Sequence, residues 1–452
     1  MEVVENLKKR SFKGGIHPAN IGIDAGKLPT RDKPVEEFIP EKVCIPMNLN
    51  LGAPSVPCVK KGETVKMGQV IGTPVGFLGL PVHDSVSGEV TEVALKQQLG
   101  ANKVMCVTIA NDRLDTEEEP LAYIGGCENA EPKDIIARLK EAGICGMGGA
   151  AFPTHVKLTI SEDKYADIVI INGCECETHL TGDFRLMLEN PQGIADGLRL
   201  CMRALGCKRG VIAIEDNKPE AIDKMRSVCE GYEGISVFVM KTKYPQGGEK
   251  QLIKAVTGRE VPRGKLPIDA HAVVVNVATS AAIANAVNNG RPLTKRITTV
   301  TGRVENPKNL LLRIGTIAGD AIEFCGGYKG NVEKLIAGGM MMGPAAPDDS
   351  FSVLKATGGI VALGEDEMIS YKEQPCIRCG KCVEACPMGL NPARMKQYCD
   401  ADDLEGAKKN NVLDCICCGC CSYVCPAHRF LAASFKNTKD KIAAAARNGG
   451  KK

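Results

Sequence analysis

The chain has 452 residues, of which 44% are apolar and 25% charged, and its formal net charge is +3. This length allows several domains with cores of their own, and the composition is ordinary for a soluble protein. The small net charge and an aromatic content of only 4% argue against a nucleic-acid-binding protein. Cysteine is the exception, because 22 residues of this type are present.

The cysteines bear on the cellular compartment. A framework of disulfides requires an oxidising, secreted context. Residues 1–6, M-E-V-V-E-N, lack the basic segment and the apolar core of a signal peptide. No run approaches 18 apolar residues, so we expect no membrane-spanning helix. The sequence therefore predicts a reduced, cytoplasmic protein that reaches a membrane only through a partner.

The first part of the chain is expected to be mainly β. Residues 1–30 form a polar lead-in with the motif F-K-G-G-I-H-P. In this motif His17 is either a ligand or, as we favour, a turn residue fixed by the following proline. Between residues 31 and 120, short apolar runs alternate with glycine and proline, a pattern typical of short strands.

The period of the apolar residues changes after residue 120. Residues 132–142 predict an amphipathic helix with proline at its start. Buried strands are expected at 166–171, 210–214, 235–240 and 271–275, with helices between them. That alternation predicts a mainly parallel α/β sheet, covered by helices on both faces, across residues 121–291. Ligands of such sheets bind at the carboxyl ends of the strands.

Four glycine-rich or polar segments accompany these strands. They are G-I-C-G-M-G-G-A-A-F-P-T-H-V-K-L at 143–158, N-G-C-E-C-E at 172–177, Y-P-Q-G-G-E at 244–249 and V-N-V-A-T-S at 275–280. The first suits a phosphate, because a loop without side chains lets backbone amides point at an anion. Each segment alone is also compatible with an ordinary turn. Together, four such segments in one α/β unit predict a binding crevice.

The chain becomes β-rich again at residues 292–350. The runs I-T-T-V-T-G-R-V and N-L-L-L-R-I-G-T predict strands, and a glycine-rich stretch with three consecutive methionines, residues 340–342, follows them. Three adjacent methionines on a strand form an exposed interaction strip or, as we favour, lie half in the core.

Two cysteine runs dominate residues 351–435. C-I-R-C-G-K-C-V-E-A-C-P and C-I-C-C-G-C-C-S-Y-V-C-P both read C-x2-C-x2-C-x3-C-P, the spacing of ferredoxins with two [4Fe–4S] clusters. In this arrangement the fourth cysteine of each run binds the other cluster. The expected ligand sets are Cys376, Cys379, Cys382 and Cys425 for one cluster, and Cys415, Cys418, Cys421 and Cys386 for the other.

Two alternatives remain open for these runs. A structural zinc site is disfavoured, because zinc usually takes paired C-x2-C segments. A different frame in the second run would use Cys417 or Cys420. Between the runs, residues 391–411 look helical and carry Cys399, which fits neither run. Residues 436–452 are expected to be a polar, mobile tail.

The four segments of the α/β unit resemble, in the same order, those of the flavoprotein subunit of respiratory complex I. The resemblance implies that they bind FMN with NADH above it. It assigns FMN contacts to Gly146, Gly148, Gly149, Lys157, Asn172, Glu175, Tyr244, Gly247, Asn276 and Thr279. It assigns nicotinamide-nucleotide contacts to Phe152, Glu177, Glu249 and Lys265. The sequence departs from that family at Cys174, where aspartate is usual, and at Gly248, where glutamate is usual.

Further modules carry resemblances of their own. G-E-T-V-K-M-G-Q-V-I followed by S-G-E-V is similar to the biotinyl/lipoyl barrel-sandwich fold. The hairpin that would carry a modified lysine reads His83-Asp84-Ser85, so we expect a docking or structural role instead. Residues 292–350 resemble the soluble-ligand-binding β-grasp module that follows the flavin domain in relatives of complex I. The order barrel-sandwich, flavin domain, β-grasp and two-cluster ferredoxin, together with F-K-G-G-I-H-P, resembles the RnfC family of Rnf complexes.

This resemblance implies an NAD(H) oxidoreductase subunit with no catalytic side chain of its own. NADH gives up two electrons as hydride and an iron–sulfur cluster accepts one, so FMN is expected between them. The implied partners are the membrane-embedded and iron–sulfur subunits of a Rnf complex, which couple ferredoxin:NAD oxidoreduction to ion translocation. Ferredoxin is expected to act through a partner subunit, at the cytoplasmic face of the bacterial inner membrane. The alternatives are a non-catalytic electron-transfer adaptor, which Cys174 and Gly248 favour, and a related cobalamin-reductase-type flavoprotein.

Overall fold

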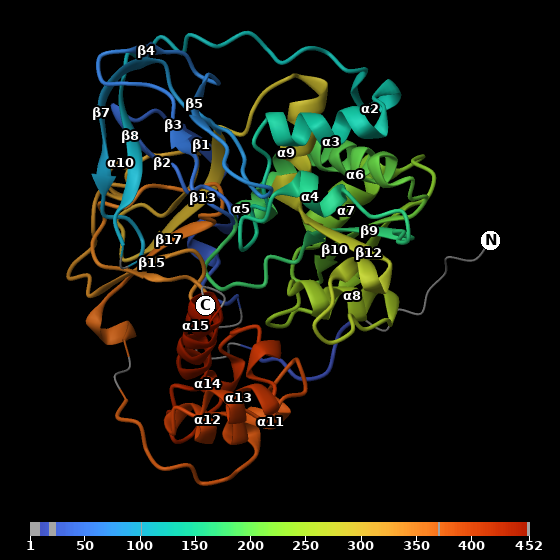
Figure 1. Cartoon of the computed structure of the whole chain (residues 1–452), viewed down its shortest axis with the longest axis vertical. Helices are drawn as coiled ribbons and strands as arrows, with labels where there is room; N and C mark the ends of the chain where they lie inside the picture. The colour runs from blue at the N-terminus through green and yellow to red at the C-terminus, as the bar shows by residue number, and fades with distance from the viewer. Residues whose placement is uncertain (1–9, 18–23, 101, 369–370, 450–452) are drawn as a thin grey trace.

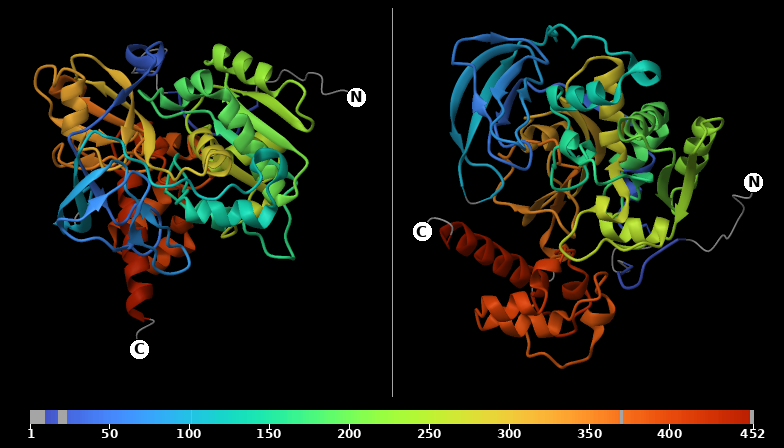
Figure 2. Two further views of the ribbon diagram at one scale, coloured as in Figure 1. Left: turned by 90° about the horizontal axis from the view of Figure 1, so that it is seen from above. Right: turned by 45° about the vertical axis from the view of Figure 1, so that its right-hand side comes forward.

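The computed structural model describes residues 10–17, 24–100, 102–368 and 371–449. Figure 1 shows a β-rich domain, drawn in blue, on one side and an α/β domain, drawn in green and yellow, on the other. A further sheet lies below the β-rich domain, and a helical module, drawn in red, lies below both (Figures 1 and 2). Within the described ranges, no helix is long and apolar enough to cross a membrane.

The β-rich domain consists of two small antiparallel sheets. In the order β2-β8-β7-β4, the first contains Lys42–Pro46, Val104–Asn111, Gly88–Lys96 and Thr64–Val65. In the order β3-β5-β6, the second contains Val56–Pro57, Val70–Thr73 and Val82–His83. Apolar side chains from both sheets, such as Val43, Ile71 and Val107, share one core. The hairpin at residues 83–85 is buried, and Ser85 Oγ donates a hydrogen bond to the Ile314 carbonyl at 2.6 Å.

A six-stranded sheet has the order β1-β14-β13-β17-β15-β16, and all of its strands except β1 follow the α/β domain in the chain. Its strands are Val35–Phe38, Lys308–Arg313, Lys295–Gly302, Gly359–Leu363, Lys334–Ala337 and Ala345–Ala346, and α10 (Ala318–Phe324) packs against it. The domain division expected from sequence differs from this strand pairing at two strands. It placed β1 with the barrel-sandwich residues and β17 with the cysteine module. The pairing of Val35 with Asn309 joins residues far apart in the chain, and such a pairing leaves no local signal.

The α/β domain confirms the predicted parallel sheet. Its strands, in the order β11-β10-β9-β12, are Ile235–Met240, Gly210–Glu215, Ile168–Gly173 and Ala272–Asn276, and all three pairings are parallel. The helices are α2 (Gly126–Asn129), α3 (Pro132–Glu141), α4 (Thr154–Leu158), α5 (Gly182–Glu189), α6 (Pro191–Leu205), α7 (Pro219–Cys229), α8 (Glu249–Thr257) and α9 (Val277–Asn288). The short helix η2 (Pro267–Ala270) precedes β12.

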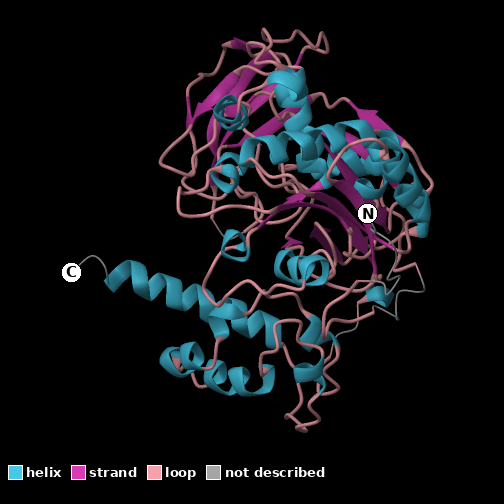
Figure 3. Cartoon of the chain, turned by 90° about the vertical axis from the view of Figure 1, so that its right-hand side faces the viewer, coloured by secondary structure: helices cyan, strands magenta, loops and turns pink. Residues whose placement is uncertain are grey.

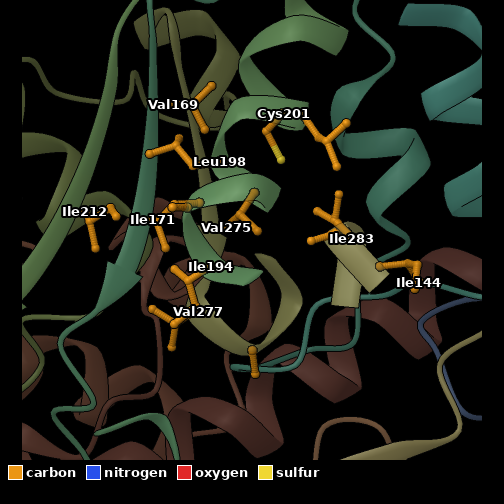
Figure 4. Packing of buried hydrophobic residues seen from close by; sticks show 14 of the residues in the cluster. Ile144, Val169, Ile171, Ile194, Leu198, Cys201, Ile212, Val275, Val277 and Ile283 are labelled. Carbon is orange, nitrogen blue, oxygen red and sulfur yellow. The ribbon is translucent and has the colours of Figure 1, made fainter. Parts of the chain in front are cut away.

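Helices cover both faces of this sheet, as predicted. Figure 4 shows Val169 and Ile171 of β9 near Ile194 and Leu198 of α6, all within one buried cluster. A second cluster joins α8 to the opposite face. Burial of each large aliphatic side chain contributes about 1.5–3 kcal/mol, so the two clusters hold the strand ends in fixed positions.

The boundaries of α6 follow from local sequence. Asn190 accepts a hydrogen bond from the Gly193 amide at 3.1 Å and so caps the helix, and Pro191 occupies its first position. Gly206, with φ at 63°, ends the helix in a left-handed conformation that other residues avoid.

The C-terminal module is helical. Its elements are η3 (Glu365–Glu367), α11 (Lys381–Glu384), α12 (Pro392–Asp400), α13 (Leu404–Lys409), η4 (Val412–Asp414), α14 (Cys420–Tyr423) and α15 (Leu431–Gly449). The expected helical character of residues 391–411 is confirmed. The segment expected to be a polar tail is helical as far as residue 449 and packs on the module up to Ile442; residues 450–452 lie outside the described ranges. Leu431, Phe435 and Ile442 give α15 a buried stripe against the module, and Figure 3 shows its far end projecting away from it.

The described part of the N-terminal lead-in, residues 10–17, joins two domains. The Arg10 carbonyl accepts a hydrogen bond from the Lys241 amide, and Ile16 pairs with Tyr244 just beyond β11. The Gly15 amide donates to the Ala385 carbonyl of the cysteine module at 2.9 Å. Pro18, the last residue of the F-K-G-G-I-H-P motif, lies outside the described ranges.

Candidate functional site

The glycine loop connects α3 to α4 and lies beside the start of α9. The Met147 amide donates a hydrogen bond to Thr279 Oγ1 at 2.9 Å. A β-carbon at Gly148 would lie 3.0 Å from the Asn276 side chain, whereas one at Gly149 would meet no atom within 4 Å. Gly148 therefore allows the loop to approach α9 closely, and Gly149 faces free space.

Asn276 caps α9 and connects it to the neighbouring helix. Its Oδ1 accepts hydrogen bonds from the Ala278 and Thr279 amides, and its Nδ2 donates to Asp183 at 2.7 Å. The glycine loop and the amino end of a 12-residue helix thus meet at one place. Backbone amides of such a helix end attract an anion.

Lys157 and Glu249 bring a charged pair to the same edge of the sheet. Lys157 Nζ lies 2.8 Å from Glu249 Oε1 and also donates to the Val274 carbonyl of β12 at 3.0 Å. Both side chains are partly exposed, so they remain accessible to a ligand. Phe152 is half-buried, and its carbonyl accepts a hydrogen bond from the Gly146 amide. Lys265 is exposed in a turn between α8 and η2.

The second and third sequence segments lie side by side. Asn172 Nδ2 donates to the Gly247 carbonyl at 2.9 Å, and Asn172 Oδ1 accepts from the Cys174 amide at 3.1 Å. The Gly247 amide in turn donates to Cys176 Sγ. The four segments that the sequence singled out are therefore gathered at the carboxyl ends of the strands.

Glu175 is buried, and its carboxylate stabilises the chain around it. It accepts hydrogen bonds from the Asp183 and Phe184 amides at the start of α5. Its φ of 46° is unusual for a residue other than glycine. Burial raises the pKa of this carboxyl to about 7, although the nearby Lys27 ammonium opposes the rise. These contacts direct the carboxylate towards α5.

Glu177 connects the α/β domain to the methionine turn, residues 340–342. Its Oε2 accepts a hydrogen bond from the Met341 amide at 3.0 Å, and burial raises its pKa. The three methionines lie in a turn between β15 and β16, and the expectation of a strand was wrong. Met341 packs towards the cysteine module, while Met342 is 56% exposed.

Tyr244 lies against the second cysteine run. Only 1% of it is exposed, and its hydroxyl donates to the Cys418 carbonyl at 2.8 Å. Ile16, Ala385 and Cys420 share its buried cluster. The side chain assigned to FMN by resemblance is therefore part of the contact between the α/β domain and the cysteine module.

The structure gathers the cysteines of the second run with one from the first. Cys386, Cys415, Cys418 and Cys421 line one small cavity, which Cys417 also borders. Burial raises the pKa of Cys382, and the charges of Cys425, Cys376 and Cys379 also raise it. Among the described residues, no three His, Cys, Asp or Glu side chains are arranged to hold a single metal ion.

The two runs differ in exposure, and three cysteines of this region, Cys399, Cys417 and Cys420, belong to neither expected ligand set. Cys376 and Cys379 are exposed, whereas Cys418, Cys420 and Cys421 are buried. Cys420 packs towards the Tyr244 carbonyl, with its Sγ at 3.9 Å. Cys399 packs within the core of the helical module.

Sequence reasoning missed the groups that support these loops from a distance. Leu51 of the β-rich domain donates its amide to the Ala151 carbonyl of the glycine loop, and Lys355 Nζ donates to the Gly143 carbonyl at 2.7 Å. Lys218 Nζ donates to the Cys174 carbonyl at 2.6 Å, and Lys27 Nζ donates to the carbonyl of the next residue, Glu175. A single lysine carries no pattern in sequence, so nothing pointed to these residues.

Comparison with protein families supports this architecture. A family described as the Nuo51 FMN-binding domain matches residues 139–285, the RnfC barrel sandwich hybrid domain matches residues 10–114, and the SLBB domain matches residues 297–345. The chain is thus a multidomain flavoprotein of the oxidoreductase class, with an FMN-binding α/β domain.

Comparison with individual proteins narrows the class. The chain is 43% identical to the C subunit of the proton-translocating ferredoxin:NAD(+) oxidoreductase complex of Clostridium ljungdahlii, over 90% of this chain and 88% of that one. It is 42% identical to the C subunit of the Na(+)-translocating ferredoxin:NAD(+) oxidoreductase complex of Acetobacterium woodii, over 98% and 100%. It is 40% identical to the C subunit of the ion-translocating oxidoreductase complex of Rhodobacter capsulatus, over 96% and 84%.

The chain belongs to the family of C subunits of ion-translocating ferredoxin:NAD(+) oxidoreductase complexes, the RnfC family. The family that the ordered motifs indicated is therefore confirmed, together with the expectation of an oxidoreductase subunit with an FMN-binding domain. Among solved structures, an NAD+-reducing [NiFe]-hydrogenase in the H2-reduced state shows a weaker likeness. It is 18% identical, with a TM-score of 0.48, over 71% of this chain and 67% of that chain.

Proposed function

We propose that this subunit passes electrons between NAD(H) and two [4Fe–4S] clusters through FMN. The contact that carries the proposal joins Tyr244 to the Cys418 carbonyl at 2.8 Å, because it brings the edge of the FMN-binding domain against a cysteine run. FMN supplies the conversion between two-electron hydride transfer and one-electron transfer. The residues of the chain bind and orient the two cofactors and the nucleotide, and none acts as an acid, base or nucleophile.

The residues at the glycine loop fit the phosphate end of FMN. Gly149 leaves free space where a ligand would lie, and the positive end of the α9 dipole nearby favours an anion. Lys157 adds a positive charge that is only partly exposed. In this proposal Asn172, Asn276 and Thr279 hold the rest of the flavin from neighbouring strand and helix ends. In this proposal Glu175 supports the site indirectly, because its carboxylate accepts a hydrogen bond from the Asp183 amide of α5.

The nucleotide is proposed to lie over the flavin, beside Phe152, Glu177 and Glu249. A carboxylate accepts hydrogen bonds from the free ribose hydroxyls of NAD(H), whereas the 2′-phosphate of NADP(H) would meet like charge. Glu249 is partly exposed and pairs with Lys157, so it is available for this contact. Lys265 is exposed on a turn beyond α8 and would approach only the far end of the nucleotide.

We propose that the cysteines bind the clusters in the crossed ligand sets that the spacing predicts. The shared cavity supports the set of Cys386 with Cys415, Cys418 and Cys421. The support for the other set, Cys376, Cys379 and Cys382 with Cys425, is the spacing of the two runs. Since Tyr244 touches the second run, we place the second-run cluster next to the flavin and the exposed first-run cluster at the exit.

The relatives suggest where this electron route leads. They are named as subunits of ferredoxin:NAD(+) oxidoreductase complexes that translocate protons or sodium ions. We propose that this chain docks as a peripheral subunit at the cytoplasmic face of a bacterial inner membrane. The membrane subunits would move the ion, and an iron–sulfur subunit would relay electrons between ferredoxin and the first-run cluster.

Flavin content tests the site, with Gly149→Val as the variant. A β-carbon at this position meets no atom within 4 Å, so the fold should persist while the flavin loses its space. We expect anaerobically purified wild-type protein to hold about one FMN and about eight irons per chain, from two four-iron clusters. The variant should lose the FMN but keep the iron, and it should unfold at the temperature of wild-type protein from which FMN has been removed. Full FMN retention in the variant, or flavin-free wild-type protein, would contradict the assignment.

A further inference from the structure

Lys27 lies far from the FMN-binding domain in sequence but is buried against it. It precedes the short helix α1 (Leu28–Arg31), and only 7% of it is exposed. Its ammonium donates to the carbonyl oxygens of Glu175 and Glu177, both at 2.9 Å, and to that of Leu180. An ammonium has three protons to donate, and three carbonyl oxygens of this one loop accept them.

Other residues of the segment around Lys27 also form hydrogen bonds with this loop. The His179 amide donates to the Ala25 carbonyl at 3.0 Å, and the hydroxyls of Thr30 and Thr181 lie 2.7 Å apart. A β-carbon at Gly26 would come within 2.7 Å of the His179 ring, so this position needs glycine. The two segments are therefore fitted to one another over several residues.

The loop needs such support, because its backbone is unusual. Glu175 and His179 both have positive φ, at 46° and 68°, which residues other than glycine rarely adopt. Backbone in this region persists only where the surroundings hold it. Charge-assisted hydrogen bonds from a buried ammonium are among the strongest means of doing so.

We propose that Lys27 is a positioning residue for the nicotinamide nucleotide. Its ammonium fixes the main chain at Glu177, while the Met341 amide fixes the carboxylate at the other end of that side chain. Glu177 is thereby held in one orientation before the nucleotide arrives. A carboxylate has more lone pairs than these contacts use, so it still accepts a ribose hydroxyl. The inference rests on the proposed function, in which Glu177 contacts the nucleotide.

Lys27 and the proposed nucleotide site belong to different domains of the chain. Lys27 lies within the residues matched by the barrel sandwich domain family, outside residues 139–285 that match the FMN-binding domain. The N-terminal part of the chain thus completes the nucleotide site of another domain. This supplies a reason for the two domains to occur in one chain.

Lys27→Met tests the proposal, because methionine keeps the length of the side chain and removes its donors. The probe is ADP-ribose, a part of NAD(H) that cannot be reduced, titrated calorimetrically into the FMN-loaded full chain. We expect its Kd to rise about tenfold or more on loss of the charge-assisted hydrogen bonds. FMN content should stay at the wild-type value. With an artificial acceptor, the KM for NADH should rise more than kcat falls.

Lys33→Met is the matched control. Lys33 lies in the same segment, is exposed, and donates to the Pro307 carbonyl of the six-stranded sheet at 2.8 Å. The Lys33→Met protein should bind ADP-ribose with the wild-type Kd. If Lys27→Met does not accumulate in folded form, Thr30→Val loosens the same anchor, and we expect about a two- to threefold rise in Kd from loss of one hydrogen bond.

Three results would overturn the inference. The first is a wild-type Kd for ADP-ribose in Lys27→Met or, where that variant fails to fold, in Thr30→Val. The second is a parallel loss of FMN and ADP-ribose, which would mean that Lys27 only supports the fold. The third is a wild-type protein that holds FMN yet binds no ADP-ribose, because this would place the failure in the proposed nucleotide site itself.

Discussion

The two cysteine runs have the same spacing but different surroundings. The first run is exposed at Cys376 and Cys379, and Ile377 between them is 68% exposed. In the second run Cys418, Cys420 and Cys421 are buried, and the Cys418 carbonyl accepts a hydrogen bond from Tyr244. Identical spacing therefore predicts two similar clusters, but the packing of the module against the FMN-binding domain gives the two runs different surroundings. In the proposed account the buried cluster exchanges electrons with the flavin and the exposed one with a partner.

The largest expected effect comes from exchanging one ligand in each run. Cys386→Ser should remove the second-run cluster, because Cys386 lies in the cavity of that run. Cys425→Ser should remove the first-run cluster instead. Each variant should retain about four of about eight irons. Electron paramagnetic resonance of the reduced proteins distinguishes the two clusters, and loss of the first-run signal in Cys386→Ser would refute the crossed ligand sets.

A smaller effect is expected at the contact between the flavin domain and the second run. Tyr244→Leu removes the hydrogen bond to Cys418 and part of the packing, which together contribute about 1–3 kcal/mol. We expect the clusters to be reduced by NADH about tenfold more slowly, since about 1.4 kcal/mol corresponds to that factor. Stopped-flow absorbance measures flavin and cluster reduction separately.

Tyr244→Phe is the matched control for this contact. It keeps the ring in the cluster of Ile16 and Ala385 and loses only the hydrogen bond. A loss of about 0.5–1.5 kcal/mol should leave a clearly smaller effect than that of leucine. Slower flavin reduction in either variant, with unchanged transfer to the clusters, would mean that Tyr244 serves the flavin rather than the docking of the module.

The smallest effect is expected at the exposed face of the first run. Ile377→Asp places a charge where a partner would bury an apolar side chain, at a cost of about 1 kcal/mol or more. Ferredoxin:NAD activity of the assembled complex should fall about fivefold, which corresponds to that energy. NADH oxidation with a small artificial acceptor should not change.

Leu114→Asp serves as the control for this variant. Leu114 is 75% exposed on the β-rich domain, so the same charge is added away from the cysteine runs. Both activities of this variant should match the wild type. Equal losses in the two variants would place the partner surface elsewhere.

The sequence predicted the local features of this molecule well. The parallel sheet followed from strand and helix alternation, because each element carries its own periodicity. The glycine loop and the cysteine spacing are also contiguous, so their chemistry is visible in a single segment. The helix that begins at Leu431 was not predicted beyond residue 436, because its many alanines and lysines obscured the buried stripe that ends at Ile442.

Long-range contacts could not be predicted from sequence. Tyr244 and Cys418 are 174 positions apart, and Lys27 lies 150 positions from Glu177. Neither contact has a motif, since a lone tyrosine or lysine has many ordinary uses. The resemblance identified Tyr244 and Glu177 as functional, but the neighbours that orient them come from other domains.

The order of cluster reduction tests the central claim most directly. Cys425→Ser protein, which should hold only the second-run cluster, would be mixed with NADH and frozen within milliseconds for electron paramagnetic resonance. The account predicts that this cluster is reduced at the wild-type rate, and that the first-run cluster in Cys386→Ser protein is reduced much more slowly. Rapid reduction of the first-run cluster in Cys386→Ser, with slow reduction of the second-run cluster in Cys425→Ser, would contradict it.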